Sequence, residues 1–329
     1  MTKQRNGFMV ALSMVGSGVL LLLLLAFLGE PAPAASQSEL RVCAEGCAYT
    51  NVQSALDAAN PGDVIQIAAD VYTGTVSRAG LRQMAYITQS VTLRGGYNAD
   101  FSAWDPALYT TTLDAEGTGR VVYAKGAISV TLEGLRLVNG YHSASGAGVY
   151  AEGVTLHVLS STIAHNRVNP NFNGNFGVGL YIGGGSLTMQ NSVVQENEPN
   201  PGGDNSHNGG GLYATNATVA ISNSQFLSNT ASFDDDVLWN VGSGGGIFLE
   251  NCEARIAGVT FRGNIATPEN SGGGGLWTRS GSLRLLDSTF EGNTNGGAAL
   301  HTAGTLVSGN TFTHNVGNGL AINAWVQQV

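Results

Sequence analysis

Large apolar residues recur along the chain at fixed distances from a short glycine-rich motif. The motif occurs five times, as GAGVY (146–150), GVGLY (177–181), GGGLY (209–213), GGGIF (244–248) and GGGLW (273–277). Counted from its third residue, positions +1, +8, +10 and +15 are large and apolar in every unit except at Ala254. Mostly polar residues flank positions +8 and +10, which is the pattern of a strand with one buried face. We therefore expect these positions to form the core, namely Val149, Leu156, Val158, Ile163, Leu180, Leu187, Met189, Val194, Leu212, Val219, Ile221, Phe226, Ile247, Ala254, Ile256, Phe261, Leu276, Leu283, Leu285 and Phe290.

A second motif, apolar-x-x-Asn, follows each glycine motif. Its asparagine lies 18 residues after the third glycine-motif residue in all five units, whereas the distance to the next unit varies as 13, 14, 17 and 11. These asparagines are Asn166, Asn197, Asn229, Asn264 and Asn293. Without the variable insertion the period is about 22 residues, too short for two helices and suited to one coil of a parallel β-helix.

Glycine and asparagine have structural roles in such a coil. Glycine tolerates positive φ and a close approach between backbones, both of which sharp turns between strands require. Asparagine also accepts the left-handed conformation. Stacked in register, the asparagine side chains can hydrogen-bond to one another in a ladder.

The N-terminal part predicts a helix ahead of the first coils. Thr50 and Gln53 have the spacing of a capping box, apolar residues follow on one helical face, and NPGD (60–63) ends the helix. DVIQI (63–67) and SVTLRGGY (90–97) read as strands, and Ala99–Leu113 reads as a longer excursion. The predicted division is residues 1–35 as a signal, 36–63 as the N-terminal segment with its capping helix, and 64–329 as a parallel β-helix that is regular from about residue 130. The pattern reaches AINAWVQQV (321–329) without an evident cap, so a fragment of a longer chain is one expectation.

Composition and charge narrow the classes of partner. Lysine occurs only at Lys3 and Lys125 and the formal net charge is −9, which argues against nucleic acid as a partner. Lys3 and Arg5 precede an uncharged run from Gly7 to Gly29, and APA (32–34) offers a small-residue cleavage site, so export is expected. If the run is not cleaved, it is long enough to anchor the protein in a membrane.

The chain contains three cysteines. Cys43 and Cys47 are four residues apart, and in an exported protein this spacing favours a local disulfide. A zinc site is the alternative, although no second cysteine or histidine pair lies nearby. Cys252 is then expected to be unpaired.

Three features together resemble a known superfamily: YTNVQSALDAANPGDVIQI (49–67), the GGG-[LI]-[YFW] units and the F-x-x-N units. The chain from about Cys43 onward resembles secreted bacterial right-handed parallel β-helix proteins of the pectate-lyase-like superfamily. The paired GG and FxxN motifs are similar to the repeats of polymorphic outer membrane proteins. The resemblance implies an all-β, right-handed parallel β-helix with a short N-terminal capping helix. It leaves activity open, because the superfamily includes lyases, hydrolases, epimerases, adhesins and inactive scaffolds.

Position +2 of each unit is aromatic and is predicted to point outward. These residues are Tyr150, Tyr181, Tyr213, Phe248 and Trp277. Because coils stack at roughly 4.8 Å, they would line a strip on one face where sugar rings could stack. The alternative is that the five rings stack on one another or lie beneath the variable loops.

Two variable loops carry acidic residues. One contains Asp234, Asp235, Asp236 and Trp239, and its neighbour contains Asp204 and His207. Asp234–Asp236 could hold Ca²⁺, and the carboxylates with His207 could cleave a glycosidic bond. A solvated acidic loop explains the same residues, and Trp239 joins the aromatic strip as a candidate glycan contact.

The active members of the superfamily carry motifs that this sequence does not reproduce. The W-x-D-H and R-x-P-x-x-R motifs of pectate lyases are missing, and so is the ordered set of polygalacturonase-type motifs. We therefore predict an exported or cell-surface scaffold that binds polysaccharide or cell-surface glycan without catalysis and without a cofactor. The alternative is a polysaccharide lyase or glycoside hydrolase centred on the acidic loop, with Ca²⁺ as its cofactor.

Overall fold

The computed structural model describes residues 39–169, 175–200, 207–231, 243–267 and 272–322. Residues 37–329 form one compact unit, and the description below concerns the described part of that unit. The predicted signal at residues 1–35 lies outside the described residues, so its prediction stands as made.

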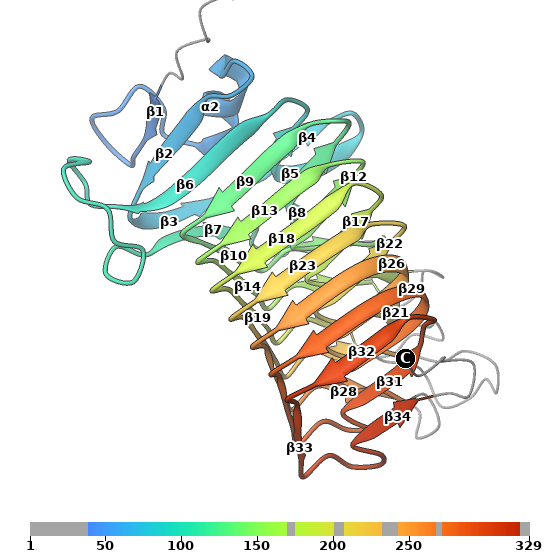
Figure 1. Cartoon of the computed structure of the whole chain (residues 1–329). Coiled ribbons are helices and arrows are strands. Elements are labelled where there is room, and N and C mark those ends of the chain that lie inside the picture. The colour runs from blue at the N-terminus through green and yellow to red at the C-terminus, as the bar shows by residue number, and fades with distance from the viewer. Residues whose placement is uncertain (1–38, 170–174, 201–206, 232–242, 268–271, 323–329) are drawn as a thin grey trace, which may run out of the picture. The chain divides into compact units, whose positions relative to one another are not determined.

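The described chain winds into a parallel β-helix, in which each coil contributes strands that pair with the coils before and after it (Figure 1). The largest sheet has 18 described strands: β1 (Glu39–Val42), β2 (Val64–Ala68), β4 (Val76–Arg78), β5 (Leu81–Ile87), β6 (Val91–Tyr97), β8 (Arg120–Lys125), β9 (Ser129–Glu133), β12 (Val149–Glu152), β13 (Thr155–Leu159), β17 (Leu180–Gly183), β18 (Ser186–Gln190), β22 (Leu212–Thr215), β23 (Thr218–Ser222), β26 (Ile247–Ala257), β29 (Leu276–Leu286), β31 (Ala298–His301), β32 (Thr305–Ser308) and β34 (Leu320–Ile322). Among these described strands only β4 pairs antiparallel, with β5.

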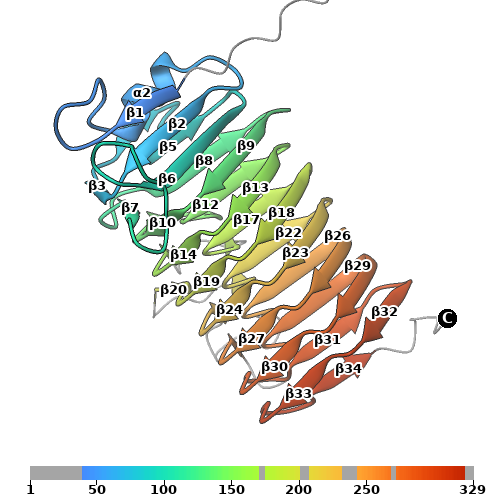
Figure 2. The same cartoon turned by 60° about the vertical axis from the view of Figure 1, so that its left-hand side comes forward.

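The remaining described strands form the other sides of the coil. A nine-stranded sheet contains β3 (Asp70–Thr73), β7 (Thr111–Asp114), β10 (Leu135–Val138), β14 (Thr162–Ala164), β19 (Val193–Gln195), β24 (Gln225–Leu227), β27 (Thr260–Arg262), β30 (Thr289–Glu291) and β33 (Thr311–Thr313). Short sheets are built from β11 (Tyr141–His142), β15 (Arg167–Val168) and β20 (Glu198–Pro199), from β16 (Asn175–Phe176) and β21 (His207–Asn208), and from β25 (Thr230–Ala231) and β28 (Ile265–Ala266). Figure 2 shows the two large sheets following one another around the coil.

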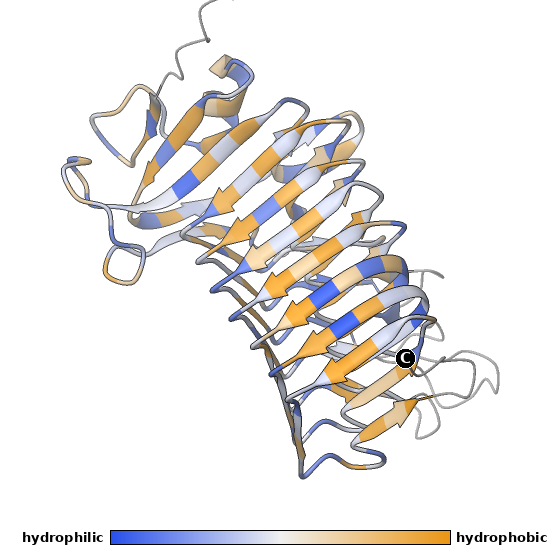
Figure 3. Ribbon diagram, viewed as in Figure 1, coloured by the Kyte–Doolittle hydropathy of each residue, from blue (hydrophilic) through white to orange (hydrophobic). Residues whose placement is uncertain are grey.

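The register of the strands equals the sequence alignment of the units. Residues at position +1 pair in succession, as Leu180 with Leu212, Leu212 with Ile247, and Ile247 with Leu276. All twenty predicted core positions are buried, none exposing more than 5% of its surface. The alternation of apolar and polar residues along the strands is visible in Figure 3. The predicted β-helix and its core are therefore confirmed.

The phenylalanines at position +15 stack inside the coil. The ring centroids of Phe226 and Phe261 lie 5.5 Å apart, those of Phe261 and Phe290 4.4 Å, and those of Phe290 and Phe312 4.7 Å. The first three rings are fully buried. Stacking adds to the hydrophobic gain of burial, so these rings hold adjacent coils together.

The glycines of each motif divide the two roles expected of them. The first glycine of each unit has a positive φ between 60° and 67°: Gly146, Gly177, Gly209, Gly244 and Gly273. The third glycine instead lies against the next coil. A Cβ on Gly211, for example, would meet the carbonyl oxygen of Gly246 at 2.5 Å. The first glycine of the motif is thus required for its positive φ, and the third, two residues later, for the close approach of the next coil.

The asparagines form the predicted ladder inside the coil. Five successive bonds join the side-chain Nδ2 of one asparagine to the Oδ1 of the next at 2.9–3.1 Å: Asn166 to Asn197, Asn197 to Asn229, Asn229 to Asn264, Asn264 to Asn293 and Asn293 to Asn315. The first five are completely buried. The expectation that these asparagines adopt the left-handed conformation is wrong. The preceding residue does so instead, for example Ser228 with φ 51°, because this turn directs the asparagine side chain inward.

A second, shorter polar ladder was not predicted. It lies at position +13, where the Ser192 hydroxyl accepts a hydrogen bond from the Ser161 backbone and that of Ser224 accepts one from Ser192. Ser288 receives the same bond from Val259. These buried hydroxyls accept hydrogen bonds from backbone N–H groups at the bend between the two large sheets. In the sequence alone they are visible only as scattered serines.

The N-terminal helix α2 (Val52–Ala58) lies at one end of the stack (Figure 1). The predicted capping box is wrong. Asn51 is the N-cap and accepts from the Ser54 backbone at 2.9 Å, whereas Gln53 is buried and its Oε1 accepts from the backbone of Tyr86 at 2.7 Å. Asn51 directly precedes the first helical residue, so its side chain caps the helix, and Gln53 is left free to join the helix to β5.

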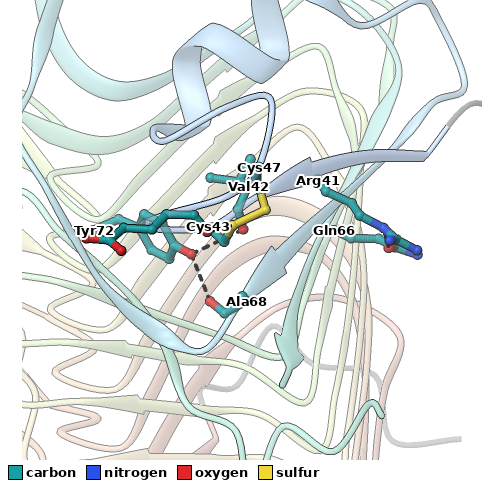
Figure 4. Close-up of a disulfide and its surroundings, with 8 residues drawn as sticks. Arg41, Val42, Cys43, Cys47, Gln66, Ala68 and Tyr72 are labelled. Atoms are coloured by element: carbon teal, nitrogen blue, oxygen red, sulfur yellow. Dashed lines mark hydrogen bonds between the residues drawn. A yellow bond between two sulfur atoms is a disulfide. The ribbon is translucent and has the colours of Figure 1, made fainter. Parts of the chain in front are cut away.

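Cys43 and Cys47 form the predicted disulfide, with their Cα atoms 5.6 Å apart (Figure 4). The nearby hydroxyl of Tyr72 donates to the carbonyl oxygens of Val42 or Ala68, at 3.2 and 3.0 Å. Cys252 is a buried free thiol, as expected. The disulfide closes a short loop directly after β1, at the same end of the stack as α2.

The predicted excursion leaves the coil after β6 and returns slightly earlier than expected, because β7 already begins at Thr111. Trp104 fastens the loop by donating from Nε1 to the carbonyl oxygen of Gly95 at 2.8 Å. The excursion is therefore tied back to the coil from which it leaves.

Candidate functional site

The five aromatic residues at position +2 form one column on the outer face of the large sheet. Successive ring centroids are 4.4–5.9 Å apart and the ring planes are within 2–21° of parallel. In order, this aromatic column consists of Tyr86, Tyr123, Tyr150, Tyr181, Tyr213, Phe248 and Trp277. Tyr86 and Tyr123 were missed because their coils lack the glycine motif, and the strand register is the signal that identifies them.

Within the column, the faces of the rings are covered by neighbouring rings. Each inner ring has another ring on both sides, and Tyr213 and Phe248 expose only 4% of their surface. Phe176 also stacks on Tyr213 at 4.5 Å, and His301 covers Trp277 at 5.1 Å. The geometry favours mutual stacking over a row of open platforms for sugars. Glycan contact by these residues stays a prediction, and along the column it falls to ring edges and hydroxyl groups.

Charged side chains flank the column on the same strands. Glu152 accepts from the Tyr150 hydroxyl at 3.0 Å and pairs with Lys125 at 2.9 Å. Glu250 likewise accepts from the Tyr213 hydroxyl and pairs with Arg279. We call Lys125, Glu152, Glu250 and Arg279 the charged row.

The ionisation of the charged row follows from these contacts. The hydrogen bond from Lys125 holds the pKa of Glu152 below its usual range. Burial opposes ionisation of Glu250, but hydrogen bonds from Tyr213 and Arg279 outweigh it and lower its pKa. Burial, reinforced by the neighbouring carboxylates, raises the pKa of Tyr150 and Tyr213. At neutral pH the surface therefore presents ionised carboxylates beside protonated phenols.

Arg120 is an unusual buried charge beside the column. It exposes 3% of its surface, donates to the carbonyl oxygen of Ser145 at 3.0 and 3.2 Å, and lies over the ring of Tyr150 at 5.0 Å. Burial lowers its pKa to about 10, so it remains charged at neutral pH. Burial and the charge of Arg120 together lower the pKa of His142 to about 4.

A polar cavity of about 480 Å³ lies elsewhere on the coil, where the nine-stranded sheet bends into β11 and β15. Asp114, Glu116, Tyr141, His165 and Arg167 contribute to its lining. Sequence reasoning missed it because these residues come from successive coils and share no motif. Both Asp114 oxygens are already occupied, by the Glu116 backbone at 2.8 Å and by the Asn139 side chain at 2.9 Å.

Most of the candidate residues in the two acidic loops lie outside the described residues. Asp204, Asp234, Asp235, Asp236 and Trp239 lie outside the described residues, so their roles in catalysis, Ca²⁺ binding and glycan contact stay predictions. His207 is described and is 1% exposed, in β21 beside β16. This burial does not suit a histidine that must reach a substrate from solvent. Within the described ranges no group of three or more histidine, cysteine, aspartate or glutamate residues is placed to hold a metal ion.

Comparison with family models supports the fold. A family model described as "Right handed beta helix region" matches residues 211–328, which agrees with the right-handed coil expected. A pectin methylesterase from Aspergillus niger is structurally similar at 12% identity and a TM-score of 0.32, over 89% of this chain and 88% of that one. No curated protein matches the sequence. The GG/FxxN likeness to polymorphic outer membrane proteins stays a resemblance. In the described part of the chain, no helix has the length and apolarity needed to cross a membrane.

Proposed function

We propose that this protein is an exported β-helix scaffold that binds glycans without catalysis, using the face that carries the aromatic column. Disulfides persist in oxidising compartments, and the Cys43–Cys47 bond supports export. A regular coil offers a long, rigid surface for such a role, and its coils are held by the asparagine ladder and the phenylalanine stack.

The observation that carries this proposal is the pairing of half-exposed tyrosine edges with the charged row. Glycans present hydroxyl groups that both donate and accept hydrogen bonds. Ionised Glu152 and Glu250 are strong acceptors, while Lys125 and Arg279 are donors. Tyr150 and Tyr181 remain half-buried beside them and supply apolar ring edges. The charged row thus lies two residues along the strands from the aromatic column, so a glycan on this face would meet both kinds of group.

The test is a binding screen of the exported protein against insoluble and soluble polysaccharides, neutral and acidic. Glu152→Gln and Lys125→Gln together should weaken retention on the bound polysaccharide, because both change the hydrogen-bonding surface without touching the core. Arg136→Gln is the matched control, since Arg136 is exposed on β10 of the other large sheet. A wild-type protein that binds no member of the panel would refute the proposal.

The alternative of a polysaccharide-cleaving enzyme has one specific observation in its favour. Asp114 and Glu116 line the same cavity, together with a tyrosine and an exposed histidine. Paired carboxylates are the groups that glycoside cleavage uses. The same panel should be assayed for new reducing ends and for unsaturated products, with and without Ca²⁺. Turnover that Asp114→Asn or Asp235→Ala abolishes would replace the non-catalytic proposal.

A further inference from the structure

The aromatic column has two different ends. At the C-terminal end His301 lies over Trp277, with centroids 5.1 Å apart and planes tilted by 33°. At the N-terminal end Tyr86 stacks on Tyr123 at 5.3 Å and 3°. Among the described residues no second ring covers Tyr86, so the face of Tyr86 that points away from Tyr123 is not used by the column.

A cavity of about 340 Å³ adjoins this end of the column. Tyr86 lines it together with Leu56 and Asp57 of α2, Arg78 at the end of β4, and Gln89. The volume lies at the lower end of the range for small-molecule sites, which suits one ring-sized group. The cavity therefore lies beside the last ring of the column at this end, among residues of α2, β4 and β5.

The walls of this cavity are held in place by hydrogen bonds. The Gln53 side chain accepts from the Tyr86 backbone at 2.7 Å, which fixes β5 against α2. The Nε2 of Gln89 donates to the carbonyl oxygens of Leu56 at 3.3 Å and Ala59 at 2.7 Å, which also satisfies two carbonyls at the end of the helix. A site with fixed walls loses little entropy when it binds a ligand.

The polar rim is an ion pair between Asp57 and Arg78, whose side chains are 44% and 45% exposed. The two charges offset each other, so the rim does not select a strongly charged ligand. It offers carboxylate acceptors and guanidinium donors at the same point, and hydroxyl groups use both. An aromatic floor with such a rim is the combination that binds a sugar ring.

We propose that this cavity binds a single pyranose unit of a glycan, with its C–H face on the outer face of Tyr86 and its hydroxyls on Asp57 and Arg78. The sugar then takes the place of the next ring of the column. This site assignment rests on the proposed glycan-binding function and locates it at the N-terminal end of the coil. The small volume means that an end of a chain or a branch enters, while the rest of the glycan lies outside.

The test uses the glycan that the polysaccharide screen retains, cut to a short oligosaccharide, and measures its affinity by calorimetry. Tyr86→Ala should weaken binding by about tenfold or more, as expected when an aromatic anchor is removed. Tyr86→Phe should bind like the wild type. Tyr141→Ala is the matched control, because it removes a tyrosine ring from the other cavity.

A second variant protects the test against misfolding of Tyr86→Ala. Thr88 is exposed and lines the same cavity, so Thr88→Trp fills it without removing a ring from the column. This variant should also lose about tenfold or more in affinity while melting like the wild type. If wild-type protein binds the oligosaccharide and both Tyr86→Ala and Thr88→Trp bind it equally well, the site assignment is wrong and the glycan-binding function stands. If wild-type protein binds no glycan, the function itself fails.

Discussion

The asparagine ladder gives the most direct test of how the coils are held together, and Asn229 is its best position. The side chain is completely buried. Its Nδ2 donates to the carbonyl oxygen of Val194 at 2.9 Å and to Asn264 Oδ1 at 3.1 Å. Its Oδ1 accepts from Asn197 twice, from the side chain at 2.9 Å and from the backbone at 3.2 Å. One residue thus connects three coils.

Asn229→Ala leaves buried groups without partners. The Asn197 backbone N–H and one Asn197 side-chain N–H lose their hydrogen bonds, while the Val194 carbonyl stays within the pairing of β19 with β24. Asn264 Oδ1 keeps its bond from the backbone of residue 229. An orphaned buried group costs about 1–3 kcal/mol, so the two donors together should lower the free energy of unfolding by about 2–6 kcal/mol.

Urea unfolding followed by circular dichroism measures this loss as a lower midpoint. Coils of a solenoid can unfold separately, so the slope of the transition must match the wild type for the comparison to hold. Asn315→Ala is the matched control at the exposed end of the ladder, where water can replace the lost bonds, and it should cost about 1–2 kcal/mol. If Asn229→Ala costs no more than Asn315→Ala, the ladder does not stabilise the coil as argued.

Three further predictions concern packing, backbone approach and pH. Phe290→Ala removes a fully buried ring from the phenylalanine stack and should cost about 3–5 kcal/mol in the same urea assay; a loss below about 1 kcal/mol would contradict the assigned core. Gly211→Ala should prevent adjacent coils from closing and reduce the yield of folded protein. Gly292→Ala has open space around its Cβ and should cost only about 1 kcal/mol, for its positive φ; equal yields of the two variants would refute the close-approach role. In the folded protein the pKa of His142 is lowered to about 4, so the unfolded chain binds this proton first as the pH falls through 6.5. The free energy of unfolding should therefore drop by only about 1–2 kcal/mol between pH 6.5 and 4, because the half-exposed ring is partly screened by solvent. In Arg120→Met the histidine pKa should rise, which an NMR titration measures, and an unchanged value would show that Arg120 has no part in the shift.

The coil and its core could be predicted because a solenoid repeats its interactions at a fixed period. Burial at positions +1, +8, +10 and +15 follows from side-chain alternation alone, and the ladder follows from asparagines in register. The conformation of the turns was less accessible. Whether Ser228 or Asn229 takes the left-handed conformation depends on which side chain must point inward, and a pattern of residue types does not show this.

The candidate site was less predictable than the fold. Position +2 was correctly placed on the outer face, but at the strand spacing of a parallel sheet large planar side chains on that face cover one another. Arg120 and the cavity at Tyr86 lie in the first coils, where the glycine motif is missing and no alignment of units identifies equivalent positions. The cavity lined by Asp114 combines residues from successive coils, so only the coordinates bring them together.

The variable segment between each ladder asparagine and the next glycine motif has a practical consequence. From each ladder asparagine to the third residue of the next glycine motif the distance varies from 11 to 17 residues, yet strand pairing continues from Leu180 to Leu276 without a shift in register. Foreign peptides could therefore be grafted into this segment in several consecutive coils. The distance between the grafted peptides would be set by the spacing of successive coils, so the protein would display epitopes at defined intervals.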